Sequence, residues 1–260
     1  IVLTVPASFD EVARDLTVEA ATLAGLSRLT LIEEPQAAFY AWLDEHANAW
    51  ANHVTVGQVI LVCDVGGGTT DFTLIVVDEA GGKLAFRRLA VGDHLMLGGD
   101  NIDVALARQM ELRLMGQPGK PDSVQWSGLV QSCRAAKEML LGDSATERVP
   151  VSVPGRTSKV IGGRLQAELA RDEVLALVLD GFLPACPWSA EPSKRLATGL
   201  QEFGLPYVAD PAITRHLALF LRRHRVARAD QPTAELTRPD GVLFNGGALK
   251  PAVVRRRILD

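Results

Sequence analysis

Short apolar runs alternate with amphipathic segments in the first part of the chain. Residues 2–5 are rich in β-forming side chains, and apolar residues then recur at helical spacing between positions 12 and 23. A second strand is predicted at residues 29–32, and Pro35 stands at the first position of a helix predicted to reach about residue 47. This strand, helix, strand, helix order is typical of an α/β fold.

The first predicted helix carries capping signals at both ends. Ser8 is a candidate N-cap residue, and Glu11 three positions later completes the pattern of a capping box. Gly25 is a candidate for the residue just beyond the C-cap, where a left-handed backbone is common. We therefore expect the helix to begin just after Ser8 and to end just before Gly25.

The rest of the chain combines a meander with several helices. Three apolar runs at residues 59–63, 72–77 and 84–89, joined by short connections, predict three strands in sequence order. Residues 184–239 are rich in proline and are expected to form an irregular elaboration with one helix, at 213–224. The other predicted elements are helices at 100–115 and 124–141, a hairpin of strands at 149–153 and 159–161 with Pro154-Gly155 at its tip, a helix at 165–182, a strand at 241–244 and a helix from about 251.

The first two strands of the meander flank the sequence Asp64-Val-Gly-Gly-Gly-Thr-Thr-Asp71. It is not a Walker A loop, because it has no Lys-Ser or Lys-Thr pair and a strand follows it. It is not a dinucleotide fingerprint either, because the third glycine of that motif falls on Asp71 and the following helix is missing. What remains is a strand–turn–strand unit with three glycines at its tip.

The glycine tip is suited to an anion. Successive amides without side chains can form an anion-binding nest, and Thr69 and Thr70 add hydroxyl donors. Asp64 and Asp71 would repel a phosphate unless a divalent cation lies between, and magnesium, which keeps several waters, suits so few carboxylates. The alternative is a plain hairpin turn, but two residues would suffice for that, so the entropic penalty of three glycines favours phosphate binding.

Composition and charge argue against several classes of function. The chain has 260 residues, 47% hydrophobic and 22% charged, with a net charge of −4, which argues against nucleic acid as a partner. The basic runs at 222–228 and 255–257 are interpreted as solvated helix faces. No apolar run reaches the roughly 20 residues of a transmembrane helix, so no membrane partner is expected. Three cysteines without zinc spacing indicate a reducing compartment, hence the cytoplasm.

Several segments, in order, resemble the ATPase domain of the seventy-kilodalton heat-shock chaperone family, of the DnaK type. The loop at 64–71 is similar to the second phosphate loop of that family, residues 133–140 to its adenosine-contacting helix, and 244–251 to its adenosine motif. The other matching segments are 5–9, Arg14, 24–26, 34–35, 92–93 and 97–103. The resemblance covers residues 1 to about 182 and 240–260, and the joint order and spacing of the motifs make it specific.

The resemblance implies an actin-like, ribonuclease-H-like ATPase fold of α/β class, with partial lobe I, most of lobe II, and nucleotide between the lobes. The implied parts are the C-terminal part of lobe IA at 1–57, the first part of lobe IIA at 58–96, lobe IIB at 97–169, and the second part of lobe IIA at 170–260. The last part contains an insertion at about 184–239 that ordinary members lack. A divergent member is therefore implied, and we expect the insertion to be a packing layer.

Position by position, the resemblance implies a site for ATP or ADP with magnesium. Asp64 would hold the magnesium through water, Asp71 would join its second shell, and Glu34 would orient the attacking water or act as base. Pro6 and Arg14 would belong to the interlobe switch. The implied nucleotide-binding residues are Gly66, Gly67, Gly68, Thr69, Thr70, Gly99, Arg134, Lys137, Gly246, Gly247 and Lys250.

Some of these residues have plainer interpretations. Glu34 could be only a favourable charge at a helix N-terminus, although it stands at a strand end, where α/β proteins tend to bind ligands. Arg14 and Lys137 could lie on exposed helix faces. Gly246-Gly247 could be a bare connection, although a helix start rich in N–H groups also suits a nucleotide.

Three positions depart from the family pattern. Arg134 stands where a ribose-binding Glu is usual, Leu141 where Ser is usual, and Lys250 where an Arg usually stacks on adenine. Lysine lacks the planar group needed for stacking. We therefore expect adenine recognition to differ from the family more than phosphate recognition does.

The resemblance also implies that the chain is a fragment. It opens on Ile1, and the first phosphate loop and catalytic lysine of the family are expected before that residue. By the same resemblance, the last helix of lobe IIA and any substrate-binding domain are expected to lie outside these residues. We expect the full-length parent to hydrolyse ATP and this fragment to do so slowly or not at all. J-domain cochaperones, nucleotide exchange factors and unfolded clients are the implied partners besides nucleotide.

Two alternatives remain open. One is another actin-fold phosphotransferase such as a sugar kinase, which would need a sugar-binding aspartate that has no signature here. The other is a non-enzymatic, nucleotide-gated interaction module whose insertion recruits a partner. The effects of Glu34→Ala and Asp64→Ala on turnover would separate the second alternative from an ATPase.

Overall fold

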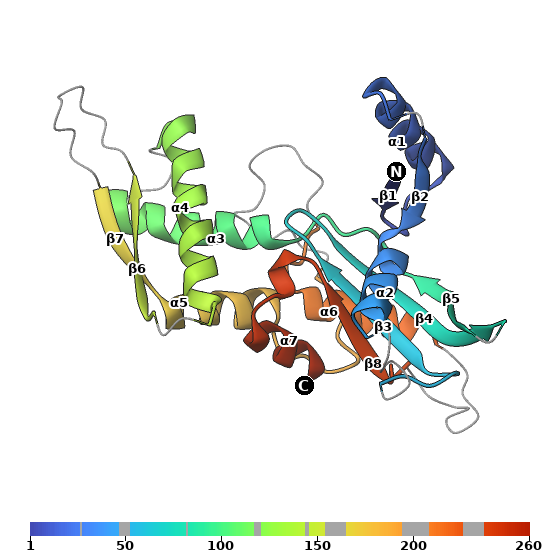
Figure 1. Ribbon diagram of the computed structural model, residues 1–260. Coiled ribbons are helices and arrows are strands. Elements are labelled where there is room, and N and C mark those ends of the chain that lie inside the picture. Colours follow the sequence, from blue (N-terminus) through green and yellow to red (C-terminus); the bar gives the residue numbers. More distant parts are fainter. Residues whose placement is uncertain are drawn as a thin grey trace. The chain divides into compact units, whose positions relative to one another are not determined.

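The computed structural model describes residues 1–26, 28–46, 53–81, 83–116, 121–143, 146–153, 165–193, 208–225 and 237–260. The chain forms two compact units (Figure 1). The first unit comprises Ile1–Val65, Thr69–Leu95 and Leu219–Gly246, and the second comprises Gly66–Gly68, Met96–Ala218 and Gly247–Asp260. Each unit combines helices with strands, so the predicted α/β class is confirmed.

The first unit begins with the predicted order of elements. β1 (Val2–Val5) pairs in parallel with β2 (Thr30–Glu33), and α1 (Glu11–Leu23) connects them. α2 (Glu34–Glu45) follows β2 directly and has Pro35 in its first turn, where the N–H that proline lacks would have no helical partner. The parallel pair with its helical crossover confirms the first four predicted elements.

The start of α1 differs from the prediction. Asp10, not Ser8, is the N-cap residue, and its Oδ1 accepts a hydrogen bond from the Ala13 amide at 2.8 Å. Asp caps a helix as well as Ser does, and the Ser8 hydroxyl instead donates to Asp71. At the other end the prediction is confirmed, because Gly25 follows the C-cap with a left-handed φ of 86°.

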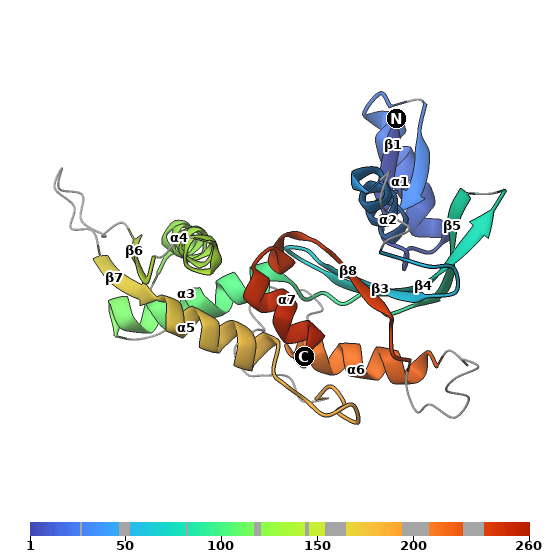
Figure 2. The same ribbon diagram turned by 60° about the horizontal axis from the view of Figure 1, so that its bottom comes forward.

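The larger sheet of the first unit has the strand order β5-β4-β3-β8 (Figure 2). β3 (Val59–Val65), β4 (Thr70–Ala80) and β5 (Lys83–Val91) form the predicted antiparallel meander, and β8 (Gly241–Asn245) pairs in parallel with β3. The core cluster consists of Phe39, Val54, Ile60, Val62, Ile75 and Val77. Because β3 is central, its carboxyl end lies between the end of β8 and the start of β4.

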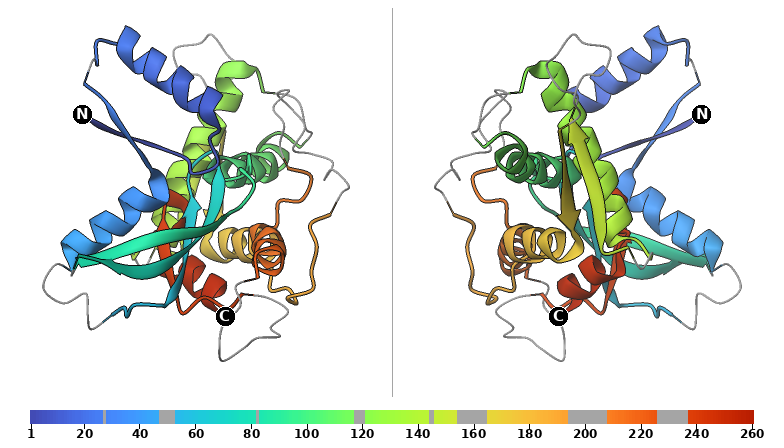
Figure 3. Two further views of the ribbon diagram at one scale, coloured as in Figure 1. Left: turned by 90° about the vertical axis from the view of Figure 1, so that its right-hand side faces the viewer. Right: turned by 90° about the vertical axis from the view of Figure 1, so that its left-hand side faces the viewer.

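The second unit packs helices on a two-stranded sheet. α3 (Gly99–Met115) and α4 (Ser123–Leu141) closely match the predicted helices. α4 packs against β6 (Arg148–Val153), as Figure 3 shows. The buried side chains of α4 and β6 include Leu129, Cys133, Leu140, Val151 and Val153.

The helix predicted at 165–182 is wrong over its first part. Leu165–Ala170 forms strand β7, antiparallel to β6, and helix α5 (Arg171–Ala176) starts only after it, followed by a π-helical segment at Leu177–Phe182. The sequence Leu-Gln-Ala-Glu-Leu-Ala consists of good helix formers, so local propensity favours a helix and only the pairing with β6 produces a strand. The predicted turn at 154–155 and strand at 159–161 lie outside the described residues.

The proline-rich stretch has α6 (Ile213–Arg223) as its one helix within the described residues. Asp210, which is 2% exposed, accepts hydrogen bonds from the Ser193 amide at 2.7 Å and from Arg215 at 2.9 Å. After β8, a 3₁₀ turn at Gly247–Leu249 leads into α7 (Ala252–Leu259). No helix in the described part of the chain combines the length and apolar character needed to cross a bilayer.

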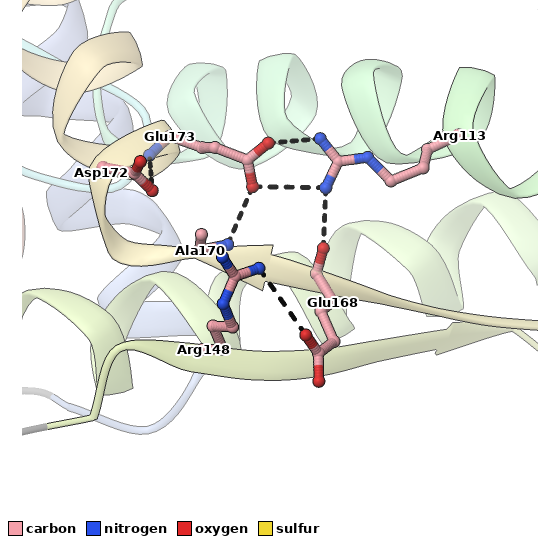
Figure 4. Close-up of polar contacts among 6 residues, drawn as sticks. All are labelled: Arg113, Arg148, Glu168, Ala170, Asp172 and Glu173. Carbon is pink, nitrogen blue, oxygen red and sulfur yellow. Dashed lines mark hydrogen bonds and ion pairs between the residues drawn. The ribbon is translucent and has the colours of Figure 1, made fainter.

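One arginine ties α3 to the junction of β7 and α5 (Figure 4). Arg113 donates to both carboxylate oxygens of Glu173 and, at 2.7 Å, to the carbonyl oxygen of Glu168. Glu173 Oε2 also accepts from the Ala170 amide at 2.9 Å. The hydrogen bond from Arg113, followed by that from Ala170, lowers the pKa of Glu173.

Arg113→Ala should lower the free energy of unfolding by about 1 kcal/mol, because it removes a two-point ion pair that solvent partly screens. Since the pKa of Glu173 is lowered, this stabilisation is present above the ordinary glutamate pKa and is lost as pH falls through the lowered value. Denaturant unfolding at neutral and acid pH measures both effects. Arg148→Ala is the matched control, because its exposed contact with Glu168 is 3.7 Å long and should contribute little. A loss that stays constant into acid pH would contradict the role of Glu173.

Candidate functional site

The three predicted catalytic carboxylates lie in the first unit. Glu34 begins α2, Asp64 lies near the end of β3, and Asp71 lies near the start of β4. In the antiparallel register, Asp64 is directly opposite Asp71. Like charges directly opposite each other destabilise a sheet, so this placement is unfavourable for the fold taken alone.

Each aspartate has partners from distant parts of the unit. Asn245 Nδ2 donates to Asp64 Oδ2 at 2.7 Å, because β8 runs parallel to β3 with these two residues in register. The Ser8 hydroxyl donates to Asp71 Oδ1 at 3.1 Å, and His94 Nδ1 lies 2.9 Å from the same oxygen. The orientation of Asp71 is therefore set by one residue before α1 and one residue after β5.

Sequence reasoning missed these three partners. The sequence predicts Ser8 as the N-cap of the first helix, and the structure overturns this prediction because Asp10 is the N-cap. His94 directly follows the Gly-Asp pair at 92–93 that carries part of the family resemblance, and Asn245 directly precedes Gly246. For His94 and Asn245, the available signal was a polar side chain at or beside a family motif that contains glycine.

The carboxylates repel one another. Burial raises the pKa of Glu34, and the charges of Asp64 and Asp71 raise it further, whereas His94 lowers it. Burial also raises the pKa of Asp64, against the effect of the hydrogen bond from Asn245. Among the described residues no group of three or more His, Cys, Asp or Glu side chains could hold a metal ion. A bound cation would relieve the repulsion among the three carboxylates.

A pocket of about 460 Å³ lies within the second unit, a volume in the range of small-molecule sites. Its small residues are Gly66, Gly67, Gly99, Gly247 and Ala248. Its apolar residues include Ile102, Leu141, Val178, Pro251 and Val254. Its charged residues include Asp100, Asp103, Arg134, Lys137, Glu138 and Lys250. Seven of the predicted nucleotide-binding positions thus line one cavity: Gly66, Gly67, Gly99, Arg134, Lys137, Gly247 and Lys250.

The glycine loop is docked on the first turn of α3. The amides of Gly99 and Asp100 donate to the carbonyl oxygens of Gly66 and Gly67 at 2.9 and 2.8 Å. In a trans peptide the N–H points opposite to the C=O, so the amides of Gly67 and Gly68 point away from α3. No acceptor for these two amides is found in the described part of the protein, which leaves them available to an anion.

Gly98 permits this docking. A Cβ at position 98 would lie 2.4 Å from the Gly67 carbonyl oxygen and 2.7 Å from that of Gly66. These are backbone atoms, which cannot move without moving the loop. The resemblance to the family included Gly98 but gave no reason for it, and the structure shows that the reason is steric.

Four charged residues cross-link α3 and α4 beside the pocket. Asp103, which is 1% exposed, pairs with Lys137 at 2.6 Å and with Arg134 at 2.8 Å. Arg134 also pairs with Asp100, and the hydrogen bond to Asp103 raises the pKa of Arg134. Lys137 and Arg134 are therefore not simply residues of an exposed helix face.

The remaining nucleotide-site candidates lie outside the pocket lining. Gly68 and Thr69 complete the loop, and Thr70 begins β4, where its amide donates to the Leu95 carbonyl at 2.9 Å. Gly246 has a φ of 89°, and a Cβ there would lie 2.2 Å from the Val65 carbonyl oxygen. A glycine is needed at 246 for the close approach of the ends of β8 and β3.

The two predicted switch residues lie near the start of the first unit. Arg14 Nη2 pairs with Glu33 at 2.8 Å, and Arg88 of β5 pairs with the same carboxylate. The Pro6 carbonyl accepts from the Phe9 amide at 3.2 Å. Arg14 thus joins α1 to the end of β2, next to Glu34.

The fold and these residues define an α/β protein with a candidate anion-binding pocket. The family model described as Hsp70 protein matches residues 1–184. The chain therefore belongs to the Hsp70 family, and the resemblance found in the sequence is confirmed.

Individual relatives match shorter or longer parts of the chain. A chaperone protein HscA homolog of Pseudomonas fluorescens is 36% identical over 178 residues, which are 68% of this chain and 24% of the relative. A chaperone protein dnaK of Thalassiosira pseudonana is 27% identical over 261 residues, covering 100% of this chain and 41% of the relative. An HscA homolog of Acidithiobacillus ferrooxidans is 35% identical over 71% of the chain and 27% of the relative. The chain thus spans about a quarter to two fifths of these curated relatives.

Gly98→Ala should lower the free energy of unfolding by about 1–3 kcal/mol, because the added methyl group overpacks against two carbonyl oxygens. The neighbouring Gly99→Ala is the matched control: the nearest atom to its Cβ would be 3.6 Å away, and alanine favours a helix over glycine. Denaturant unfolding of both variants measures the difference. Equal stabilities would show that the loop does not dock on α3 in this way.

Glu34→Gln should raise stability at neutral pH by up to about 1 kcal/mol, since it removes a partly screened carboxylate that repels its neighbours. A carboxyl with a raised folded-state pKa destabilises the fold above that pKa, so the gain should shrink as pH falls through the raised value and vanish below the ordinary one. Thermal unfolding across pH measures it. Glu33→Gln is the adjacent control and should destabilise, because Glu33 pairs with Arg14 and Arg88. If both variants destabilise alike, the repulsion is absent.

Proposed function

We propose that the chain is part of the ATPase domain of a DnaK-like chaperone and binds ATP or ADP with magnesium. The observation that carries the proposal is the glycine loop, whose Gly67 and Gly68 amides point away from α3 beside a pocket of about 460 Å³. Membership of the Hsp70 family supports the same function. A sugar kinase is not favoured, because the family match gives it no support.

The pocket residues divide between two ends of a nucleotide. The amides of the loop, with the Thr69 hydroxyl, would hold phosphate. Gly99, Gly247 and the apolar side chains of Leu141 and Val254 would surround the nucleoside, for which a mostly apolar wall is typical. Lys137, held by Asp103, would supply positive charge without being free to leave the site.

Asp64 and Asp71 lie close to the loop because they flank it in the sequence. Asp64 precedes Gly66 by two residues, so their Cα atoms are at most about 8 Å apart. Bound magnesium would supply charge neutralisation at the phosphates, as in phosphoryl transfer generally. Asp64 and Asp71 would hold its waters, and Glu34, whose pKa is raised, would orient the attacking water or take its proton.

The finer architecture belongs to the same proposal. An actin-like, ribonuclease-H-like fold is supported by family membership and by a sheet in which a meander is extended by parallel strand β8. The proposed parts are lobe IA to residue 57, lobe IIA at 58–96 and 170–260, and lobe IIB at 97–169. The 184–239 stretch would be a packing layer added to lobe IIA.

The cellular setting is proposed by the same reasoning. The free cysteines Cys63, Cys133 and Cys186 support a reducing compartment, the cytoplasm. J-domain cochaperones, nucleotide exchange factors and unfolded clients are proposed as partners of the whole protein.

Titration calorimetry of the 260-residue chain with ATP and ADP should show binding that strengthens with magnesium, because the repelling carboxylates then gain a counter-charge. Phosphate release from ATP should be slow or undetectable and should not respond to added sugars. Absence of nucleotide binding with and without magnesium would refute the proposal, and rapid turnover would refute the expected weak activity.

Substitutions in the full-length protein separate an ATPase from a binding module. Glu34→Ala should reduce turnover by at least about a hundredfold, the usual scale for a residue that assists proton transfer. Asp64→Ala should also reduce turnover strongly, because the magnesium waters would lose a partner. Arg148→Ala, far along the chain on β6, is the control and should leave turnover unchanged. If both carboxylate variants bind nucleotide and keep the parent rate, the protein is a non-enzymatic module.

A further inference from the structure

The side chain of Asp100 lies directly beside the glycine loop. Its Oδ1 atom is 3.1 Å from the position that a Cβ would take at Gly67, and its amide is bonded to the Gly67 carbonyl at 2.8 Å. The carboxylate is 56% exposed and lines the pocket. A full negative charge therefore stands beside the glycine loop, which is unfavourable for the binding of a phosphate there.

Arg134 of α4 neutralises this charge. Its Nη2 atom pairs with Asp100 Oδ1, while its Nε donates to Asp103 Oδ2 at 2.8 Å. Asp103 is buried and is also paired with Lys137 at 2.6 Å. The charges of the two carboxylates and the two basic side chains therefore cancel. Of the two partners of Arg134, only Asp100 is exposed to solvent.

The geometry allows one end of the guanidinium to change partners. The hydrogen bond from Nε to Asp103 fixes the plane of the group, because Asp103 is held on its other side by Lys137. Guanidinium binds carboxylate and phosphate with the same donor geometry. The exposed pair with Asp100 is the weak one, since solvent screens exposed ion pairs.

We propose that Asp100 and Arg134 form an exchangeable ion pair that selects polyphosphate over nucleoside. When a nucleotide places its phosphates on the glycine loop, Arg134 releases Asp100 and bonds the phosphate, and Asp100 turns to solvent. Asp100 thus competes with the phosphate for Arg134. Arg134 binds the phosphate of the nucleotide and does not bind its ribose. The inference rests on the proposed nucleotide binding and assigns to this pair the preference for charged ligands.

The alternative is that the pair only cross-links α3 and α4. A cross-link would affect the stability of the unit and would change the affinities for all ligands of the pocket together. An exchangeable pair changes the affinity for ATP relative to adenosine, which has no phosphate. The ratio of these two dissociation constants is therefore the decisive readout.

The experiment measures the dissociation constants of ATP, ADP and adenosine for the 260-residue chain by titration calorimetry, with magnesium present. Asp100→Asn should tighten ATP binding about three- to tenfold, because a charge next to the loop is removed while Arg134 remains. Adenosine binding should stay unchanged. Arg134→Gln should weaken ATP binding by a similar factor and leave adenosine unchanged.

Matched controls come from an exposed ion pair of the same unit. Glu168→Gln and Arg148→Gln remove the same charges from a pair that is 3.7 Å long and on β6 and β7. They should leave the ATP-to-adenosine ratio unchanged, which excludes a general effect of net charge.

The outcomes separate the exchange from the proposed function. If the parent chain binds ATP and Asp100→Asn only lowers the melting temperature, with the ratio constant, the pair is a structural cross-link and the exchange is refuted. If ATP and adenosine affinities change together, the exchange is refuted as well. If no variant binds any of the three ligands, the proposed function fails and the exchange fails with it.

Discussion

Two hydrogen bonds between the glycine loop and the first turn of α3 set the chemistry of the pocket. Because the carbonyl oxygens of Gly66 and Gly67 are turned to α3, the amides of Gly67 and Gly68 are turned away from it. This requires Gly98, since any side chain there would collide with the loop. The same helix start carries Asp100, so the contact that turns the amides away from α3 also places one carboxylate beside the loop.

The charged side chains of the two units differ in their partners. In the second unit Asp103 is matched by Lys137 and Arg134, and the cluster holds two helices together. In the first unit Glu34 and Asp64 keep raised pKa values, and Asp64 faces another aspartate across paired strands. Repulsion of this kind is retained where a cation is to be bound, because the cation then relieves it. Under the proposed function the two groups would have separate roles, a hydrated metal at one and phosphate at the other.

Local patterns predicted most elements but not their surroundings. The meander is predicted by three apolar runs joined by short connections, and α3 and α4 are predicted by apolar residues at helical spacing. The same reasoning is wrong at Leu165–Ala170, where helix formers pair with β6 as a strand. Helical spacing in α1 was read correctly, yet Val12, Leu16 and Leu23 are 66%, 59% and 83% exposed. The periodicity of a helix shows which of its faces is apolar, but it does not show which other segment packs on that face.

By itself the sequence determined the glycine loop, the order of the elements and the family, because these are encoded in contiguous residues and their spacing. Only the tertiary structure decided the partners of the charged side chains. Ser8 meets Asp71 across 63 residues, and Arg134 meets Asp103 across 31. Such contacts depend on strand register and helix packing between distant segments. No local pattern records them, so the sequence predicted Ser8 as a helix cap and gave no partner for Arg134.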